Sequence, residues 1–358
     1  MVTVVDSFYT LWYDINTMAY DIKTAVQAVL ASIAKRSAVI LEKRFGLGKS
    51  GTLYTLEAIG DSYGITRERV RQIEADSLQR IRKSSAYEGL QPIFVDFTNY
   101  ITEQGGMVAE ERLFSRFSDG GTSGQMVRFL STLNPHMIFR GESDIWKSRW
   151  GLDGGVMDAV EHAVQRVAKT VASKGETVVY DTLGRLMEQE LAAESIPTPR
   201  KEIIAGYLAS SKQIGKNHFN QWGHTSSPLV RPRGVRDLAY LVFQKAGEPM
   251  HFSAAAERIR EIASGRSVHA QTVHNELIKD KRFVLVGRGM YGLADWGYEP
   301  GTVRDIIVRV LSAGPLKKES LIERVLEKRQ VKENTILINL QNREHFKKLG
   351  DGTYTNVV

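Results

Sequence analysis

Hydrophobic and polar positions recur with a helical period along much of the chain, and the period is sharpest at residues 55–83. Leu56 and Ile59 give a first short helix its buried side. After Gly64, which tolerates the positive φ of a tight turn, Thr66 is suited to cap a second helix. At about 100° per residue, one stripe of that helix holds small and apolar positions, namely Val70, Ile73, Ser77 and Ile81. The pattern predicts a helix-turn-helix.

A second stripe of the same helix lies roughly 150° from the first and is polar. Its members are Arg67, Glu68, Arg71 and Gln72. Arginine can bind guanine bidentately, glutamine can bind adenine, and glutamate can accept a hydrogen bond from the cytosine amino group. Because recognition helices enter the major groove by their N-terminal end, this stripe is a candidate for base recognition. The alternative is a solvated face held by weak side-chain pairs.

A block of roughly 60–70 residues then recurs, with three helices followed by an aromatic-rich hairpin. The aromatic ends of these blocks lie at 139–152, 218–223, 283–293 and 346–354. Two short strands joined by Gly-Arg-Gly or Gly-Asp-Gly, with alternating apolar side chains, form a hairpin that packs on the preceding helices. The pattern is typical of the wing of a winged helix.

The expected fold class is mainly α, with tandem helix-turn-helix and winged-helix modules that have short β-hairpin wings. We expect an N-terminal helical segment, a helix-turn-helix and four winged-helix-like repeats at 1–35, 36–90, 91–155, 156–232, 233–297 and 298–358.

Composition limits the function classes. Of 358 residues, 42% are hydrophobic and 25% charged, which fits a globular chain, and no apolar run approaches the roughly 18 residues that span a bilayer. With no cysteine, disulfide scaffolds and thiolate zinc sites are excluded. No secretion signal is recognisable, so we expect a cytoplasmic, nucleoid-associated protein. The net charge of +7 favours double-stranded DNA as partner over a membrane surface, because the basic residues are scattered over several helices.

Motifs for catalysis are missing from the sequence. The segment around Gly48 superficially matches a phosphate-binding loop, but Lys43 occupies the position that requires glycine. The pairs His269 with His274 and His218 with His224 lack the spacing of metal ligands on one helix face. We therefore expect no enzyme, no catalytic residue, no metal, no cofactor and no small-molecule substrate.

The order of residues in three segments, Arg44–Leu47, Thr55–Gly60 and Thr66–Ala75, closely resembles the C-terminal domain of primary bacterial sigma factors, region 4. That domain binds the minus-35 promoter element and docks on the flap of the RNA polymerase β subunit. The resemblance implies that Arg67, Glu68, Arg71 and Gln72 contact bases, while Thr66 and Arg69 contact phosphates. Little chain precedes Arg44, so we do not expect the upstream promoter-melting domain, nor transcription initiation by this chain alone.

Residues 235–296 resemble the HARE-HTH winged-helix family, on the segments 238–243, 247–252, 272–277 and the wing at 287–293. That family includes the N-terminal domain of the RNA polymerase δ subunit and modules fused to chromatin and restriction proteins. The shared motifs are core and turn residues, so the resemblance implies fold more than activity. Three wing cations, Arg288, Lys347 and Lys348, are candidates for phosphate contacts, or else are solvated turn charges.

The sequence thus favours a sequence-specific, sigma-factor-like DNA-binding transcription regulator that also contacts RNA polymerase. One alternative is a polymerase accessory protein whose winged helices contact protein, which would bind DNA weakly and without sequence preference. Another is the DNA-sensing component of a restriction, modification or defence system, which would prefer modified DNA.

Overall fold

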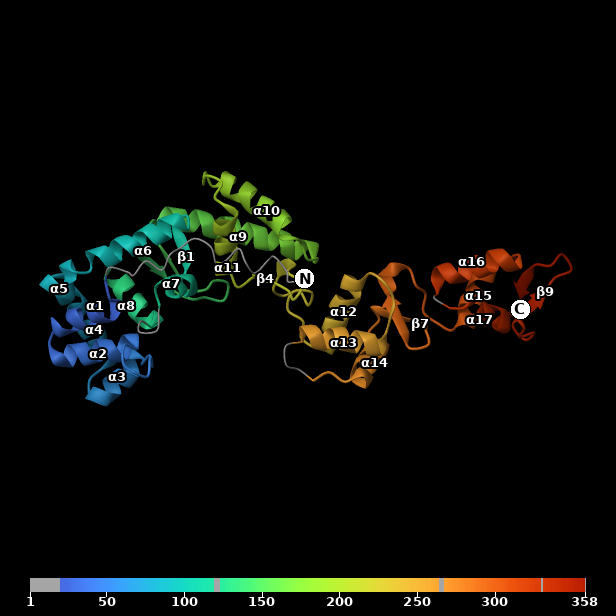
Figure 1. Cartoon of the computed structure of the whole chain (residues 1–358), viewed down its shortest axis with the longest axis horizontal. Helices are drawn as coiled ribbons and strands as arrows, with labels where there is room; N and C mark the ends of the chain where they lie inside the picture. The colour runs from blue at the N-terminus through green and yellow to red at the C-terminus, as the bar shows by residue number, and fades with distance from the viewer. Residues whose placement is uncertain (1–19, 119–122, 264–266, 330, 358) are drawn as a thin grey trace. The chain divides into compact units, whose positions relative to one another are not determined.

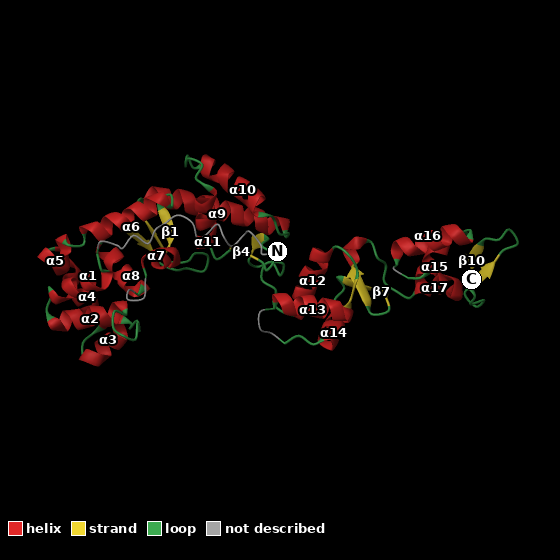
Figure 2. Ribbon diagram, in the orientation of Figure 1, coloured by secondary structure: helices red, strands yellow, loops and turns green. Residues whose placement is uncertain are grey.

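The computed structural model describes residues 20–118, 123–263, 267–329 and 331–357, and residues are discussed only within these ranges. The chain forms two compact units, one of residues up to 170 with 180–214, the other of 171–179 with 215–358. Helices dominate both, and the strands form small antiparallel sheets (Figures 1 and 2). Within the described ranges, no helix is both long and apolar enough to cross a membrane.

The first unit opens with short helices. They are α1 (Ile22–Ala31), α2 (Lys35–Phe45), α3 (Leu56–Tyr63), α4 (Arg67–Arg82) and α5 (Ser85–Glu88). The Asp21 carboxylate caps α1 by accepting from the backbone N–H groups of Lys23 and Thr24. Helix α2 ends at Gly46, whose φ of +64° is the left-handed conformation that glycine adopts without strain.

A winged helix follows in the same unit. Its elements are α6 (Gln91–Glu103), β1 (Met107–Ala109), α7 (Glu110–Phe117), α8 (Gly124–Leu133), β2 (Ile138–Arg140) and β3 (Arg149–Gly151). The three strands form an antiparallel sheet in the order β1-β3-β2, in which Trp150 of the central strand pairs with both Val108 and Phe139. The hairpin of β2 and β3 is the expected wing.

The same element order recurs with α9 (Gly154–Lys174), α10 (Tyr180–Ala193), α11 (Lys201–Ser210), β4 (Ile214–Lys216) and β5 (Trp222–His224). In place of a first strand, Val178 forms a single antiparallel bridge with Trp222 in the second unit. Helix α9 contributes residues to both units.

One hydrophobic core joins the helix-turn-helix to the first winged helix. It combines apolar residues of α1, α2, α4, α6, α7, α8 and both β1 and β3. At its centre the rings of Phe45 on α2 and Phe129 on α8 meet edge to face, with centroids 5.1 Å apart. At its margin, Arg82 and Tyr87 donate to the backbone oxygens of Thr132 and Leu133 at the end of α8. These two modules therefore share a core rather than forming separate domains.

Helix α11 packs against β1 of the first winged helix, also within the first unit. The buried phenol of Tyr207 donates to the backbone oxygen of Gly105 at 2.6 Å. The backbone adds an antiparallel bridge between Trp146 and Ser211. The third helix of this repeat, α11, is thus partly buried by packing inside the first unit.

In the second unit a further winged helix comprises α12 (Val235–Ala246), β6 (Met250–His251), α13 (Phe252–Ile262), α14 (Ala270–Lys279), β7 (Phe283–Gly287) and β8 (Met290–Leu293), followed by the 3-10 turn η1 (Ala294–Trp296). Its sheet has the order β6-β8-β7. Phe243 packs edge to face on Phe283, which ties the wing to the first helix of the module.

The last repeat comprises α15 (Val303–Leu311), α16 (Lys318–Lys328), α17 (Glu333–Leu340), β9 (Phe346–Lys348) and β10 (Tyr354–Asn356). Leu316 bridges Tyr354, which adds a third short strand segment beside the wing. A capping box at Thr302 and Asp305 fixes the start of α15.

The expected fold class is confirmed: helix-turn-helix and winged-helix modules with short hairpin wings follow one another along the chain. The module boundaries stay a prediction, and α1, placed in a separate N-terminal segment, instead packs into the core of the first unit. The aromatic residues of that segment at 9, 12 and 13 lie outside the described residues.

Candidate nucleic-acid interface

The turn between α3 and α4 fixes where the candidate recognition helix points. Gly64 has a φ of +65°, as the sequence predicts. Gly60 is required for a different reason: a Cβ there would lie 2.6 Å from the backbone oxygen of Ile65, closer than real contacts allow. The two glycines together let the chain reverse within a few residues and start α4.

The buried side of α4 fastens it to the helices around it. The Thr66 hydroxyl accepts from the backbone N–H of Arg69 at 3.2 Å, so Thr66 caps the helix as expected. Val70 packs with Ile40 and Ile59 in a small core of α2, α3 and α4, whereas Ile81 enters the large core of the first unit. The predicted apolar stripe is therefore the packed face of the helix.

The six residues predicted to contact DNA all lie exposed in the first two turns of α4 or at its cap. Two pairs form along the helix. Arg71 donates to both carboxylate oxygens of Glu68, from Nε at 2.9 Å and from a terminal nitrogen at 2.7 Å. Arg69 donates to the Gln72 side-chain oxygen at 3.2 Å. The Arg71 hydrogen bonds lower the pKa of the Glu68 carboxyl below its usual range.

These pairs define what the face offers to a ligand. Arg67 is in none of the ion pairs among the described residues and projects at the helix N-terminus, where the dipole also favours phosphate. Arg71 has its guanidinium plane already fixed by Glu68, and both side chains are more than half exposed. Arg71 could therefore contact a base edge without a change in the orientation of its guanidinium group. The arrangement suits a major-groove contact made by the first turns of the helix.

A separate groove of about 390 Å³ lies on another side of α4, where it faces α2. It is lined by Ala34, Arg36, Ser37, Ile65, Arg69, Ile73, Asp76 and Arg80. Its members on α4 lie roughly 100–150° around the helix from the polar stripe, at 100° per residue. Half-buried Ile65 and Ile73 give the groove an apolar floor. A third stripe of α4, at positions i, i+4, i+7 and i+11 from Arg69, is the sequence signal for this groove.

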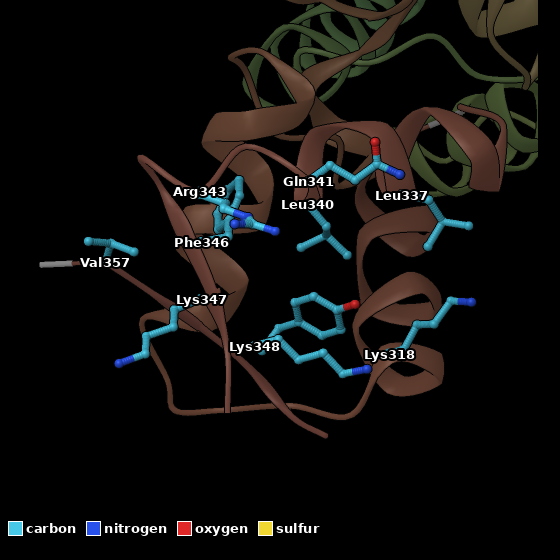
Figure 3. A pocket seen from close by; sticks show the side chains of 10 residues that line it. Lys318, Leu337, Leu340, Gln341, Arg343, Phe346, Lys347, Lys348 and Val357 are labelled. Atoms are coloured by element: carbon cyan, nitrogen blue, oxygen red, sulfur yellow. The ribbon is translucent and has the colours of Figure 1, made fainter. Parts of the chain in front are cut away.

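The wing candidates lie in two modules. Arg288 is exposed in the turn between β7 and β8 and forms no ion pair with a described residue. Lys347 and Lys348 are adjacent on β9 and extend to opposite sides of the strand (Figure 3). Lys348 places its ammonium group 6.0 Å from the centroid of the Tyr354 ring. The two lysines therefore cannot act on the same face of the wing.

Two further cations line the groove with Lys348, one of them close to it in sequence and one far from it. Lys318 begins α16, and Arg343 follows the end of α17. Both line the same groove as Lys348 (Figure 3). Nothing local in the sequence links Lys318 to the other two. In the described ranges, no group of three or more histidine, aspartate or glutamate side chains is arranged to hold a metal ion.

Comparison with known proteins agrees with the geometry of the first module. The family model for sigma-70 region 4 matches residues 29–83. An RNA polymerase sigma factor, SigA of Bacillus sp, is 40% identical over 77 residues, which is 21% of this chain. The match spans only 20% of the length of that sigma factor. The resemblance of residues 235–296 to HARE-HTH modules stays a prediction. Residues 29–83, with α4 as their longest helix, form a sigma-70 region 4 domain.

Proposed function

We propose that this protein is a sigma-factor-like, DNA-binding transcription regulator that recognises promoter-type duplex DNA through α4. One observation carries the proposal: a region 4 domain presents Arg67, Arg71 and Gln72 on the exposed first turns of a helix whose other side is packed. These are the side chains that bind guanine and adenine edges. Glu68 orients Arg71 or accepts from cytosine, and Thr66 and Arg69 would contact flanking phosphates.

The proposed partners are double-stranded DNA and RNA polymerase, and the proposed location is the cytoplasm. Polymerase contact is supported by the groove between α2 and α4, because it lies away from the polar stripe and has an apolar floor at Ile65 and Ile73. A protein partner in this groove would leave Arg67, Arg71 and Gln72 exposed to DNA. Arg69 also lines the groove, so the partner and a phosphate would share this side chain. The β flap is the surface that the sigma-factor resemblance suggests for that partner.

The same groove supports a second candidate, the polymerase accessory protein. In that case the region 4 domain would engage polymerase, and DNA binding would be weak and independent of sequence. The two candidates differ in one measurable property, the existence of a preferred duplex sequence. Neither candidate requires catalysis by this chain.

The test is selection from randomised duplexes with the full chain, with and without core RNA polymerase. We expect one short motif to be enriched. On that motif Arg71→Ala should weaken binding by about 1–3 kcal/mol and relax the preference at one base pair, because one bidentate contact is lost. Gln72→Ala should relax the preference at a neighbouring position.

The matched control is Arg80→Ala. Arg80 lies on the same helix, is 70% exposed and pairs with Asp76, but sits near the C-terminal end of α4 on the side of the groove. In the selection without polymerase, its removal should leave the selected motif unchanged. If no motif emerges under either condition while the chain co-purifies with polymerase, sequence recognition is wrong and the accessory role is favoured.

A further inference from the structure

The last winged helix contains a large groove that lies outside the region 4 domain. It has a volume of about 1020 Å³ and is bounded by the start of α16, the end of α17 and the wing (Figure 3). It is lined by Lys318, Leu337, Leu340, Gln341, Arg343, Phe346, Lys347, Lys348, Tyr354 and Val357. None of these lining residues is acidic.

Two of the cations are directed at one space. Lys348 extends from β9 toward α16, and Arg343 extends from the end of α17 toward the same space (Figure 3). Lys318 is the first residue of α16 and lines the groove at the positive end of the helix dipole, although Glu319 lies in the same first turn. None of the three is in an ion pair among the described residues, although all are exposed.

Other cations of the same unit are neutralised by carboxylates. Arg282 bonds to Asp280 and Asp237, and Lys328 pairs with Glu299. In the groove of the last module, Arg343 and Lys348 instead converge without a carboxylate partner. Unpaired cations around a concave surface repel one another, and a polyanion that binds there relieves the repulsion and releases its own counterions.

The third helix beside the groove is free to take part. Helix α17 buries only Ile336 and Leu340, about 40° apart around the helix at 100° per residue. Ile338 is 60% exposed, and Gln341 lines the groove. The groove thus lies between an open third helix and the wing, where it can receive the sugar-phosphate ridge of a duplex while α17 faces the adjoining DNA groove.

We propose that the last winged helix is a second DNA site, independent of α4, which binds the duplex backbone without base recognition. Lys318, Arg343 and Lys348 contact phosphates across the groove between α17 and the wing. Lys347 is also among the lining residues, but its side chain extends to the opposite side of β9 from Lys348, so its ammonium group does not take part (Figure 3). Because phosphate contacts position a protein on DNA but do not specify sequence, this site holds any duplex.

The test uses the full chain carrying Arg67→Ala and Arg71→Ala, so that the contribution of α4 is reduced. Binding to a fluorescein-labelled duplex of scrambled sequence is followed by anisotropy over a series of salt concentrations. Adding Lys318→Gln, Arg343→Gln and Lys348→Gln should lower affinity about tenfold or more. It should also reduce the slope of log K against log salt by about 2–3, since each phosphate contact contributes about 0.9.

Lys347→Gln in the same background is the matched control and should change neither affinity nor slope appreciably. All the substituted residues are exposed, so thermal unfolding of each variant should match the parent. An unchanged slope in the triple variant, or an equal loss with Lys347→Gln, overturns the proposal. Displacement of the duplex by poly-glutamate at equal charge concentration would also overturn it, in favour of an acidic protein segment. Selection of a motif through α4 is a separate measurement and can succeed or fail on its own.

Discussion

The winged helices of the two units differ in how much of the third helix is left uncovered. In the first unit, α8 buries Val127, Phe129, Leu130, Ser131 and Leu133, which span an arc of about 200°, and α11 buries an arc of about 160°, both at 100° per residue. In the second unit, α14 buries only Val273 and Leu277, and α17 only Ile336 and Leu340. One element order therefore supports two roles, a scaffold and an open helix.

The difference follows from what packs on each helix. Helix α8 is covered by α1 and by α2 of the region 4 domain, and α11 is covered by β1 of the neighbouring repeat. A helix enclosed in this way cannot enter a DNA groove, because uncovering it would expose a core. In the first unit, α4 is thus the helix available to DNA, and a packed core supports it. In the second unit, the third helices α14 and α17 are available beside their wings.

The largest expected effect concerns the enclosed helix. Phe129→Ala should destabilise the first unit by about 3–5 kcal/mol, because the side chain is fully buried and its ring contact with Phe45 is lost. The region 4 domain and the first winged helix should lose structure together, since they share a core. Chemical denaturation followed by hydrogen exchange would measure both the loss and its extent.

Its control is Ile278→Ala on α14 in the second unit. Ile278 is 62% exposed, so removing it should change stability by no more than about 0.5 kcal/mol. Comparable losses in the two variants would break the comparison between enclosed and open third helices. Separate melting of the region 4 domain in Phe129→Ala would contradict the shared core.

A smaller effect is expected at the contact that covers α11. Burial raises the pKa of the Tyr207 phenol to about 12, and the phenol donates to Gly105. A raised pKa means that the folded state holds the proton more tightly, so this stability is complete below about pH 10 and is lost as pH rises through about 12.

Tyr207→Phe should therefore cost about 1 kcal/mol at neutral pH, because the Gly105 oxygen loses its donor. It should also make the first unit less sensitive to alkali between about pH 10 and 12. Denaturation midpoints of the parent and the variant over this range test the prediction. The control is Tyr298→Phe, since Tyr298 is a half-buried tyrosine of the second unit whose ring packs on Trp296. If Tyr207→Phe and the parent lose the same amount of stability between about pH 10 and 12, a group other than Tyr207 causes the loss.

The sequence alone predicts those features of the two units that depend on local interactions. The α4 stripes, the Thr66 cap and the four hairpin wings follow from periodicity and turn chemistry, which act within a few residues. The burial of α8 could not be predicted from these local patterns, because it depends on contacts with α1 and α2, which lie about a hundred residues earlier in the chain. The opposite directions of Lys347 and Lys348 were available from strand alternation. Their relation to Lys318 and Arg343 depends on the tertiary fold.

The smallest expected effect lies at the pair of Glu68 and Arg71 on α4, the exposed helix of the first unit. The hydrogen bonds from Arg71 lower the pKa of Glu68, so any stability from the pair is present above the ordinary carboxyl pKa and is lost as pH falls through the lowered value. Because both side chains are more than half exposed, the effect on unfolding should be hard to detect.

The titration itself should be measurable by NMR of the Glu68 side chain. Arg71→Ala should return its pKa toward the ordinary range, while Arg80→Ala, one of whose neighbours is Asp76, should not. A Glu68 pKa that is equal in the parent and in Arg71→Ala would mean that the pair does not persist in solution. Arg71 would then reach DNA without a fixed guanidinium plane, and α4 would lose the orientation that distinguishes it from an ordinary solvated helix.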